Sequence, residues 1–235
     1  MSTSPTQVVD LSRTLRHMGP STRSQPVPMM FPTVGHAQTV GRFDGAFSIA
    51  SMGLVLSDHA GSHVDAWSHL SKELWALPID RMPLAGFMGA GMVIDVSDHE
   101  ARSEVGPEVL EREEIRSALQ SAEAVLFRTN SSPEPTTDLG VYLEEFPGLS
   151  ASLIHALADM GVRIVGTDAR SIDLAAAESG ADGLPAHRSC LDRQVLVYEN
   201  LYLPANLANR SFTFIGMPLK LEGCTGSPVR AIALL

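Results

Sequence analysis

The sequence SDHAGSHVDAWSH, residues 57–69, gathers side chains that bind metal ions, with three of the eight histidines and two aspartates. On a helix, His59 and His63 would share a face, but Asp65 would point roughly 200° away from His63. On a strand, His59 and His63 would share a face but lie about 13 Å apart. Ligand bonds of about 2.0–2.2 Å to one ion cannot span that distance.

A metal site in this stretch therefore requires the backbone to bend between the two histidines. Gly61 is the residue that permits such a bend. Beyond it, His63 and Asp65 would be neighbours on one strand face, about 6.6 Å apart at the backbone. The alternative is that the histidines lie in an exposed turn and bind nothing. Two histidines and a carboxylate around one glycine favour the metal site.

This stretch resembles the motif H-x-G-T-H-x-D-x-P-x-H of the metal-dependent cyclase-family hydrolases. That family includes bacterial kynurenine formamidases, isatin hydrolases and a trans-dienelactone hydrolase. Five positions match the motif, namely His59, Gly61, His63, Asp65 and His69. Three positions differ: Ser62 replaces threonine but keeps the hydroxyl, Trp67 replaces proline, and Leu70 stands where an aromatic residue is common.

A second stretch carries a histidine and a buried carboxylate. Residues 194–198 are typical of a strand, on which Glu199 would share an apolar face with Val195 and Val197. A carboxylate there is costly unless it is paired or binds a metal. In the family, a histidine and a glutamate twelve residues apart complete the metal environment before an E-N-L segment. His187 and Glu199 have that spacing, and Asn200-Leu201 follows.

Residues 166–173, GTDARSID, resemble the family segment G-x-D-x-x-S-x-D. We interpret its polar residues as structural. Ser171 and Asp173 can cap a helix over residues 172–178. Asp168, at the end of a strand, can orient a loop or a ligand residue.

The resemblance implies a ligand set of nitrogen and oxygen atoms, which suits Zn or Mn. His59, His63 and Asp65 would hold a first ion. Asp65 would bridge to a second ion held by His187 and Glu199. The alternative is a single ion, with His187 and Glu199 outside its ligand shell.

A bound divalent ion lowers the pKa of water from 15.7 to about 7 and polarises a carbonyl. Hydrolysis of an amide or ester follows as the predicted reaction. His69 lies four residues past Asp65, too far along a strand to reach the same ion easily. The family resemblance implies that it moves a proton as the catalytic residue, as the matching histidine of the family does.

The expected substrate is a small molecule with a cyclic amide, N-formyl amide or lactone carbonyl. Trp67 with Phe31 or Phe43 could form a flat aromatic wall, which favours an isatin-like cyclic amide. N-formylkynurenine and a dienelactone are the alternatives. A different class also remains open: a metal- or ligand-binding protein without turnover, or a natural-product cyclase.

Composition excludes several other classes. The chain has 235 residues, of which 44% are hydrophobic, enough for one domain over residues 1–235. A net charge of −10 without a basic cluster argues against nucleic acid and anionic membranes as partners. Cys190 and Cys224 form no disulfide framework, and no signal peptide or apolar run of about 18 residues is visible. A cytoplasmic protein is expected.

Strands are predicted over residues 8–12, 46–57, 91–96, 124–128, 163–166, 194–198, 212–221 and 229–234. Helices are predicted over residues 107–122 and 150–161, and residues 18–45 read as a long loop that covers the site. The family resemblance implies an α/β fold: a β-rich single domain of the swivelling β/β/α type, with a mixed sheet and flanking helices. It also implies a homodimer or homotetramer.

Overall fold

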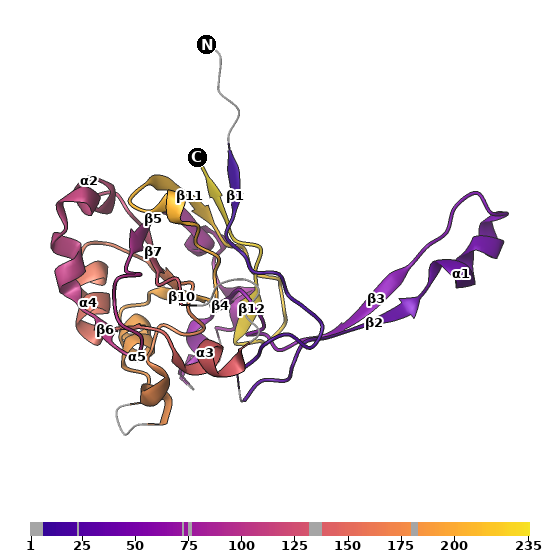
Figure 1. Ribbon diagram of the computed structural model, residues 1–235, viewed down its shortest axis with the longest axis horizontal. Helices are drawn as coiled ribbons and strands as arrows, with labels where there is room; N and C mark the ends of the chain where they lie inside the picture. The colour runs from indigo at the N-terminus through magenta and orange to yellow at the C-terminus, as the bar shows by residue number, and fades with distance from the viewer. Residues whose placement is uncertain (1–6, 23, 72, 75–76, 132–137, 180–182) are drawn as a thin grey trace, which may run out of the picture.

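The computed structural model describes residues 7–22, 24–71, 73–74, 77–131, 138–179 and 183–235. Within these ranges the largest sheet has nine strands, in the order β1-β13-β11-β5-β7-β9-β10-β4-β12 (Figure 1). Four central strands run parallel: β5 (Met88–Asp95), β7 (Ala124–Arg128), β9 (Ile164–Thr167) and β10 (Leu196–Glu199). Antiparallel strands extend it: β1 (Val8–Asp10), β13 (Ile232–Leu234), β11 (Ser211–Ile215), β4 (His63–Asp65) and β12 (Gly226–Pro228). This mixed sheet confirms the predicted β-rich α/β fold.

The parallel strands are buried on both faces, as alternate side chains show. In β5, Met92 and Ile94 face the helices α4 (Ala151–Asp159) and α5 (Pro185–Asp192), which pack against each other, while Val93 faces the opposite side. The second face is covered by aromatic residues such as Phe87 and Phe214 and by irregular segments. Parallel strands are typically covered on both faces, and in this chain helices cover one face while the aromatic and irregular segments cover the other.

Shorter elements connect the sheet. Five of the 3₁₀ turns are η2 (Trp67–His69), η3 (Ile79–Arg81), η4 (Leu84–Phe87), η7 (Ala175–Ser179) and η8 (Ala205–Leu207). A small parallel pair joins β6 (Glu104–Val105) and β8 (Gly148–Leu149). The helix α3 (Leu139–Glu144) was not predicted; it begins at Asp138, whose side chain accepts hydrogen bonds from the amides of Gly140 and Val141. No helix in the described ranges has the length and apolar character that crossing a membrane requires.

Of the three predicted helices, the one over residues 150–161 is confirmed. Ser150 caps α4 by accepting a hydrogen bond from the amide of Leu153 at 3.1 Å, and Gly161 ends the helix at φ +92°. The predicted helix over residues 107–122 is wrong as one element. It divides into η5 (Pro107–Glu111), η6 (Glu113–Ile115) and α2 (Arg116–Leu119). Arg112 interrupts it in an extended conformation while its guanidinium donates to the carbonyl of Asp95 at 2.7 Å.

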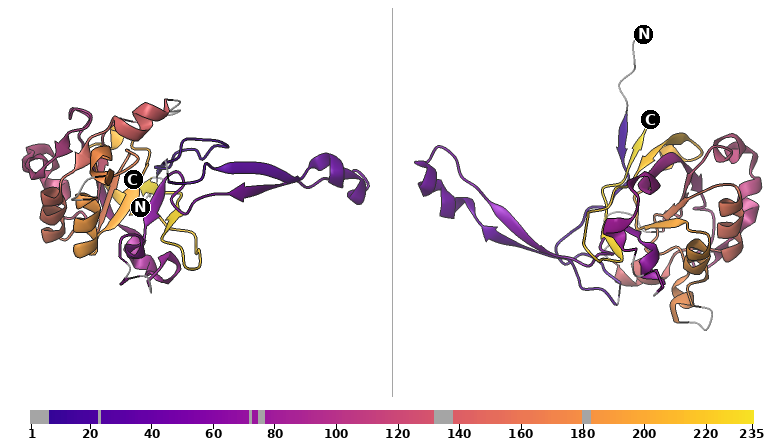
Figure 2. Two further views of the ribbon diagram at one scale, coloured as in Figure 1. Left: turned by 90° about the horizontal axis from the view of Figure 1, so that it is seen from below. Right: turned by 180° about the vertical axis from the view of Figure 1, so that it is seen from behind.

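The predicted loop over residues 18–45 is also corrected. Among the described strands, β2 (Met29–Val34) and β3 (Ser51–Val55) pair with each other and not with the large sheet. With α1 (His36–Thr39) and η1 (Val40–Phe43) they form an arm over residues 29–55 that projects from the body (Figures 1 and 2). The predicted strand over residues 46–57 is therefore β3 of this arm, at Ser51–Val55, and not a strand of the large sheet. Of the described residues in the predicted loop, those that border the cavity discussed below, such as Ser21 and Ser24, precede the arm.

Candidate metal centre

The metal-binding stretch bends at Gly61, as the sequence required. Gly61 adopts φ +65°, and the chain then enters β4 with His63 and Asp65 both buried. Antiparallel pairing of β4 with β10 places His63 directly opposite Glu199. Directly opposite residues on neighbouring strands lie about 4.5–5.5 Å apart, so strand register, not sequence proximity, brings these two side chains together.

The first turn of α5 places His187 beside Glu199. Asp173 accepts hydrogen bonds from the amides of Ala186 and His187 and from Nδ1 of His187, the last at 2.6 Å. Nε2 of His187 then lies 3.2 Å from Oε1 of Glu199. Asp173 thus orients a candidate ligand, and our prediction that it caps a helix over residues 172–178 is wrong. Asp168 orients a loop, as expected, by binding the amides of Thr129 and Asn130.

His59 lies beside the carboxylate of Asp65. Its Nδ1 lies 2.7 Å from Oδ1 of Asp65, and its Nε2 lies 3.0 Å from the hydroxyl of Thr225. That hydroxyl donates to Asp58 at 2.9 Å. Because the outer ring nitrogen is engaged by Thr225, Nδ1 is the atom that His59 offers to an ion at Asp65.

The spacing of these buried atoms fits a divalent ion. Two ligand atoms about 2.05 Å from a tetrahedral ion are roughly 3.3 Å apart. Nε2 of His63 lies 3.5 Å from oxygens of both Asp65 and Glu199, and Nε2 of His187 lies 3.4 and 3.2 Å from the second oxygens of these residues. Oδ1 of Asp65 has no assigned hydrogen-bond partner in the described structure, although Nδ1 of His59 lies 2.7 Å from it. A buried carboxylate oxygen without a donor is rare.

The candidate ligands form two overlapping groups. His63, Asp65 and Glu199 make one, and His59, Asp65 and His69 the other, each with ligand atoms within 4.8 Å of one another. This division differs from the expected pairing of His59 with His63. His69 was expected to lie too far along a strand, but η2 turns the chain and brings its ring 4.2 Å from that of His59. Asp65 is common to both groups.

Comparison with known proteins places this site in a family. The sequence profile of the Cyclase family matches residues 9–174, more than half of the chain. The chain belongs to the cyclase family. This confirms the resemblance drawn from residues 57–69.

Individual relatives of this cyclase-family chain agree. It is 36% identical over 194 residues to a kynurenine formamidase of Salinibacter ruber, covering 83% of this chain and 84% of the relative. A kynurenine formamidase of Delftia acidovorans is 33% identical over 180 residues, 76% of this chain and 77% of the relative. The fold is similar to that of isatin hydrolase A from Ralstonia solanacearum, with a TM-score of 0.83 at 23% identity over 98% of this chain and 92% of that one.

Ser62 occupies the threonine position of the cyclase-family motif, and its hydroxyl makes two hydrogen bonds. The Ser62 hydroxyl donates to the carbonyl of Asn200 at 2.6 Å and accepts from the amide of Arg13 at 2.8 Å. Both bonds use only the hydroxyl, so the missing methyl leaves them intact. They hold the backbone after Glu199 against the metal-binding stretch.

The charged side chains of the cluster shift one another's pKa values in the direction opposite to the effect of burial. Burial alone would lower the pKa of His63, but the hydrogen bond with Glu199 and the charge of Asp65 raise it to about 9. Burial alone would raise the pKa of Glu199, but His187 and His63 lower it to about 2. The pKa of Asp65 is likewise lowered against burial, by His187 and His59. Protons on the histidines thus balance the carboxylates, and a divalent ion would compete for the same atoms.

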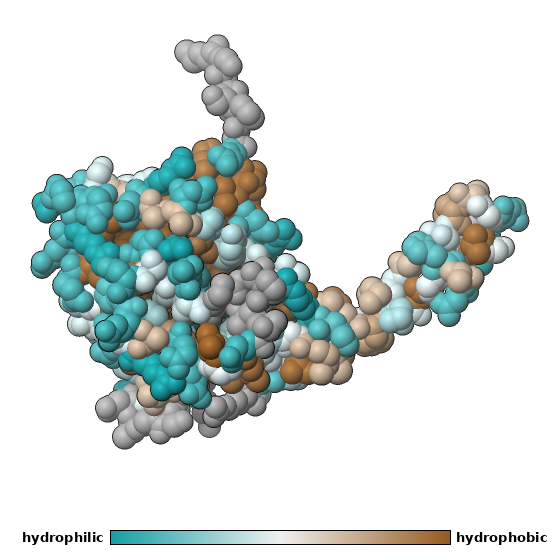
Figure 3. All heavy atoms as spheres, in the orientation of Figure 1, coloured by the Kyte–Doolittle hydropathy of each residue, from teal (hydrophilic) through white to brown (hydrophobic). Residues whose placement is uncertain are grey.

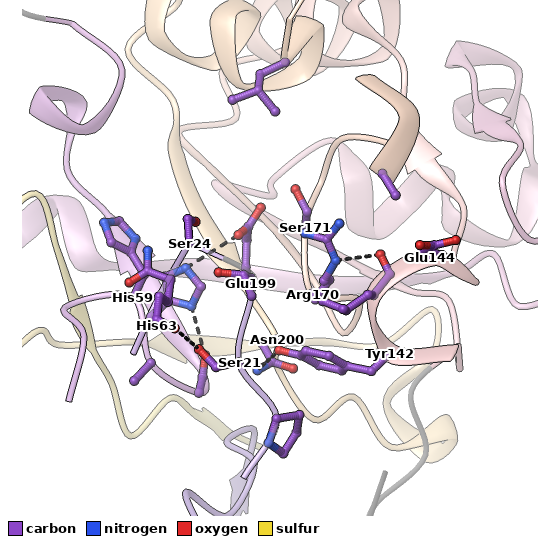
Figure 4. Close-up of a pocket in the computed structure, with 18 of the residues that line it drawn as sticks. Ser21, Ser24, His59, His63, Tyr142, Glu144, Arg170, Ser171, Glu199 and Asn200 are labelled. Atoms are coloured by element: carbon purple, nitrogen blue, oxygen red, sulfur yellow. Dashed lines mark hydrogen bonds and ion pairs between the residues drawn. The ribbon is translucent and has the colours of Figure 1, made fainter. Parts of the chain in front are cut away.

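The cluster opens into a cavity of about 720 Å³ whose lining includes His59, His63, His69, His187 and Glu199 (Figure 4). The predicted aromatic wall does not line it. Trp67 packs against the hydrophobic core, and Phe31 lies on the arm with 47% of its surface exposed. The side chain of Phe43 lies outside the described part of the structure.

The sequence reasoning missed Tyr142 and Arg170, both of which line the cavity. Tyr142, on the unpredicted α3, accepts a hydrogen bond from the Asn200 side chain at 3.1 Å. Burial raises the pKa of Tyr142 to about 12, so its hydroxyl keeps its proton at neutral pH. The E-N-L resemblance pointed to Asn200, but no local pattern pointed to its aromatic partner.

A substitution at Gly226 on β12 tests whether metal binding depends on the position of His59. A Cβ at Gly226 would lie 2.6 Å from Cε1 and 2.9 Å from Nδ1 of His59, and 2.9 Å from a backbone oxygen. We expect Gly226→Ala to displace His59 and to weaken Zn or Mn binding roughly 10- to 100-fold, as changes beside a ligand do. Competition with a chelator measures this affinity.

Gly86→Ala is the matched control, because its Cβ would meet only Leu196 at an ordinary 3.7 Å. Unchanged metal affinity in folded Gly226→Ala protein would show that His59 does not bind the ion.

Proposed function

We propose that this cyclase-family chain is a divalent-metal-dependent amide hydrolase. His63, Asp65, His187 and Glu199 would hold Zn or Mn, and His59 with His69 would complete the site or hold a second ion through Asp65. The convergence of buried nitrogen and oxygen atoms at 3.2–3.5 Å carries this proposal. The kynurenine formamidases at 36% and 33% identity support amide hydrolysis as the reaction.

A bound ion would supply Lewis acidity, lowering the pKa of water and polarising the scissile carbonyl. The chain supplies the remaining parts. Burial, with the nearby charge of His59, lowers the pKa of His69, so its ring is neutral at pH 7 and can take up a proton. His69 would then return that proton to the departing nitrogen. Asp173 and Thr225 fix the rings of His187 and His59 throughout.

Among substrates, we propose an N-formyl aryl amine in place of isatin. The preference for isatin depended on a wall of Trp67 with Phe31 or Phe43, and neither Trp67 nor Phe31 lines the cavity. The relatives named kynurenine formamidase are closer in sequence than the isatin hydrolases, whose similarity at 22–23% identity concerns the fold.

Turnover of three substrates tests the proposal: N-formylkynurenine, isatin and a dienelactone, each with protein loaded with Zn or Mn. We expect hydrolysis of the N-formyl amide, loss of activity after chelation and recovery on adding the metal back. Product mass separates hydrolysis, which adds water, from cyclisation, which does not. Metal-loaded protein that is inactive on all three and on a wider ester and amide panel would support a metal-binding protein without turnover.

The exposed apolar residues of the arm support assembly of the chain with a second copy of itself as a proposal. Met52, Leu54 and Phe47 expose 58–59% of their surfaces along it, and Figure 3 shows apolar residues on its face. An isolated two-stranded hairpin is marginally stable in water. We propose a homodimer in which each arm packs on the other subunit.

Light scattering at micromolar concentration measures this assembly. We expect a mass of twice 25.2 kDa, and a shift towards 25.2 kDa in Met52→Asp/Leu54→Asp protein. Four copies would support a homotetramer instead. A wild-type monomer would contradict the proposal.

A further inference from the structure

Tyr142, on α3, brings to the cavity a hydroxyl that the proposed reaction does not use. The residue is 4% exposed and belongs to neither group of candidate ligands, yet it lines the cavity of the metal centre. In Figure 4, Tyr142 lies on one side of Glu199, and His59 and His63 lie on the other. A formyl group carries only hydrogen beyond its carbonyl, so the part of an N-formyl substrate that extends away from the metal centre is its leaving part, which departs with the amine nitrogen.

The hydrogen bond between Tyr142 and Asn200 leaves the tyrosine proton available. Nδ2 of Asn200 donates to the Tyr142 hydroxyl at 3.1 Å, so the tyrosine oxygen is the acceptor in this contact. A tyrosine hydroxyl accepts through its oxygen and can also donate its one proton. Because burial raises the pKa of Tyr142 to about 12, that proton is present at neutral pH. Among the described residues, no acceptor is assigned to it.

Asn200 is fixed by its backbone as well as by its side chain. Its amide donates to the carbonyl of Ala169 at 2.8 Å, and its carbonyl accepts from the Ser62 hydroxyl at 2.6 Å. The residue is 6% exposed and adopts φ +57°, a left-handed conformation that asparagine tolerates better than most residues. Because both of its backbone groups are held, Asn200 keeps donating to Tyr142, and the tyrosine proton stays free for a ligand in the cavity.

We propose that Tyr142 donates a hydrogen bond to a carbonyl oxygen in the leaving part of the substrate, and that Asn200 orients the hydroxyl for this contact. The inference rests on the proposed hydrolase function and adds a specificity-determining residue to it. Buried polar groups in native proteins are almost always hydrogen-bonded, so a substrate without an oxygen at this place leaves the donor unpaired in the complex. A site built to hydrogen-bond a substrate group discriminates against an analogue that lacks the group.

Matched formanilides test the inference: the ortho, meta and para formamidoacetophenones, and their ethyl counterparts, in which a CH₂ group replaces the carbonyl. Tyr142→Phe removes only the hydroxyl. It should lower kcat/KM for at least one acetyl isomer roughly 3- to 10-fold, mainly through KM, as loss of one neutral hydrogen bond does. The ethyl counterpart should change less than about twofold, and metal content should stay the same. Comparing the two proteins on the same pair cancels the electronic effect of the acetyl group.

Tyr202→Phe is the control, because it makes the same change in a ring that is 44% exposed and absent from the cavity lining. Asn200→Asp gives a second measurement. An aspartate side chain only accepts, so it would take the Tyr142 proton from the substrate and lower kcat/KM for the same acetyl isomer. Asn200→Asp in Tyr142→Phe protein measures the effect of the added charge alone, and the acetyl isomer should lose little more than its ethyl counterpart there.

Equal effects of Tyr142→Phe on the acetyl and ethyl members of all three pairs would overturn the inference. So would loss of bound metal in Tyr142→Phe, since a structural tyrosine would act in that way. If metal-loaded wild type hydrolyses no formanilide, the hydrolase proposal fails, and calorimetry with the aminoacetophenones and ethylanilines decides this inference separately. Weaker binding of one aminoacetophenone by Tyr142→Phe than by the wild type, with its ethylaniline unchanged, would support it. Equal binding by both proteins, or no binding, would overturn it.

Discussion

Asp65→Asn should abolish stoichiometric metal binding and lower kcat/KM for an N-formyl aryl amine at least roughly 1,000-fold. Asp65 is the residue common to both groups of candidate ligands, and each of its oxygens faces a different histidine. An amide replaces one carboxylate oxygen by a nitrogen that cannot bind a cation. It also removes the negative charge that His59 and His187 share.

Elemental analysis and thermal unfolding measure the loss of metal binding in Asp65→Asn independently of its activity. Wild-type protein should gain stability on adding Zn or Mn, since an ion that binds only the folded state stabilises it. Asp65→Asn should show no such gain. Asp159→Asn is the control, because Asp159 lies at the end of α4 and belongs to neither group of candidate ligands. Full metal content in Asp65→Asn would contradict the proposed ligand set.

Local patterns in the sequence predicted what depends on local geometry. The bend at Gly61 followed from the spacing of His59, His63 and Asp65, and it is present at φ +65°. Strand β7 occupies the predicted residues 124–128, and Ser150 caps α4 as expected. Each of these features depends on residues within a few positions of one another. Membership in the cyclase family followed from five positions matched in register.

Features that depend on distant segments could not be derived in the same way. Glu199 meets His63 because β4 adds antiparallel to the parallel strand β10, and no local pattern specifies that pairing. The strand over residues 46–57 had the right composition but the wrong partner, since apolar β-compatible residues fit an arm as well as a sheet. Arg170 lies beside Phe146 only after β9 and the segment following α3 pack together. The cytoplasmic location stays a prediction.

His69→Ala should lower kcat roughly 100- to 10,000-fold while KM changes little, the range expected for loss of a general acid–base. The reason is the position of the neutral His69 ring, which borders the cavity beside His59. His155→Ala is the control, since His155 belongs to α4 and to neither ligand group.

Metal content decides between two roles for His69, because the structure places it within reach of the ion that His59 and Asp65 could hold. If His69 carries a proton and does not bind the ion, His69→Ala protein should keep its full metal content and lose most of its kcat. A ligand predicts that metal and activity fall together, and that excess Zn or Mn restores part of both. Since the turn at η2 makes either role possible, metal content and kcat have to be measured on the same sample. Full activity in metal-replete His69→Ala protein would exclude both roles and assign the proton transfer to another residue of the cavity.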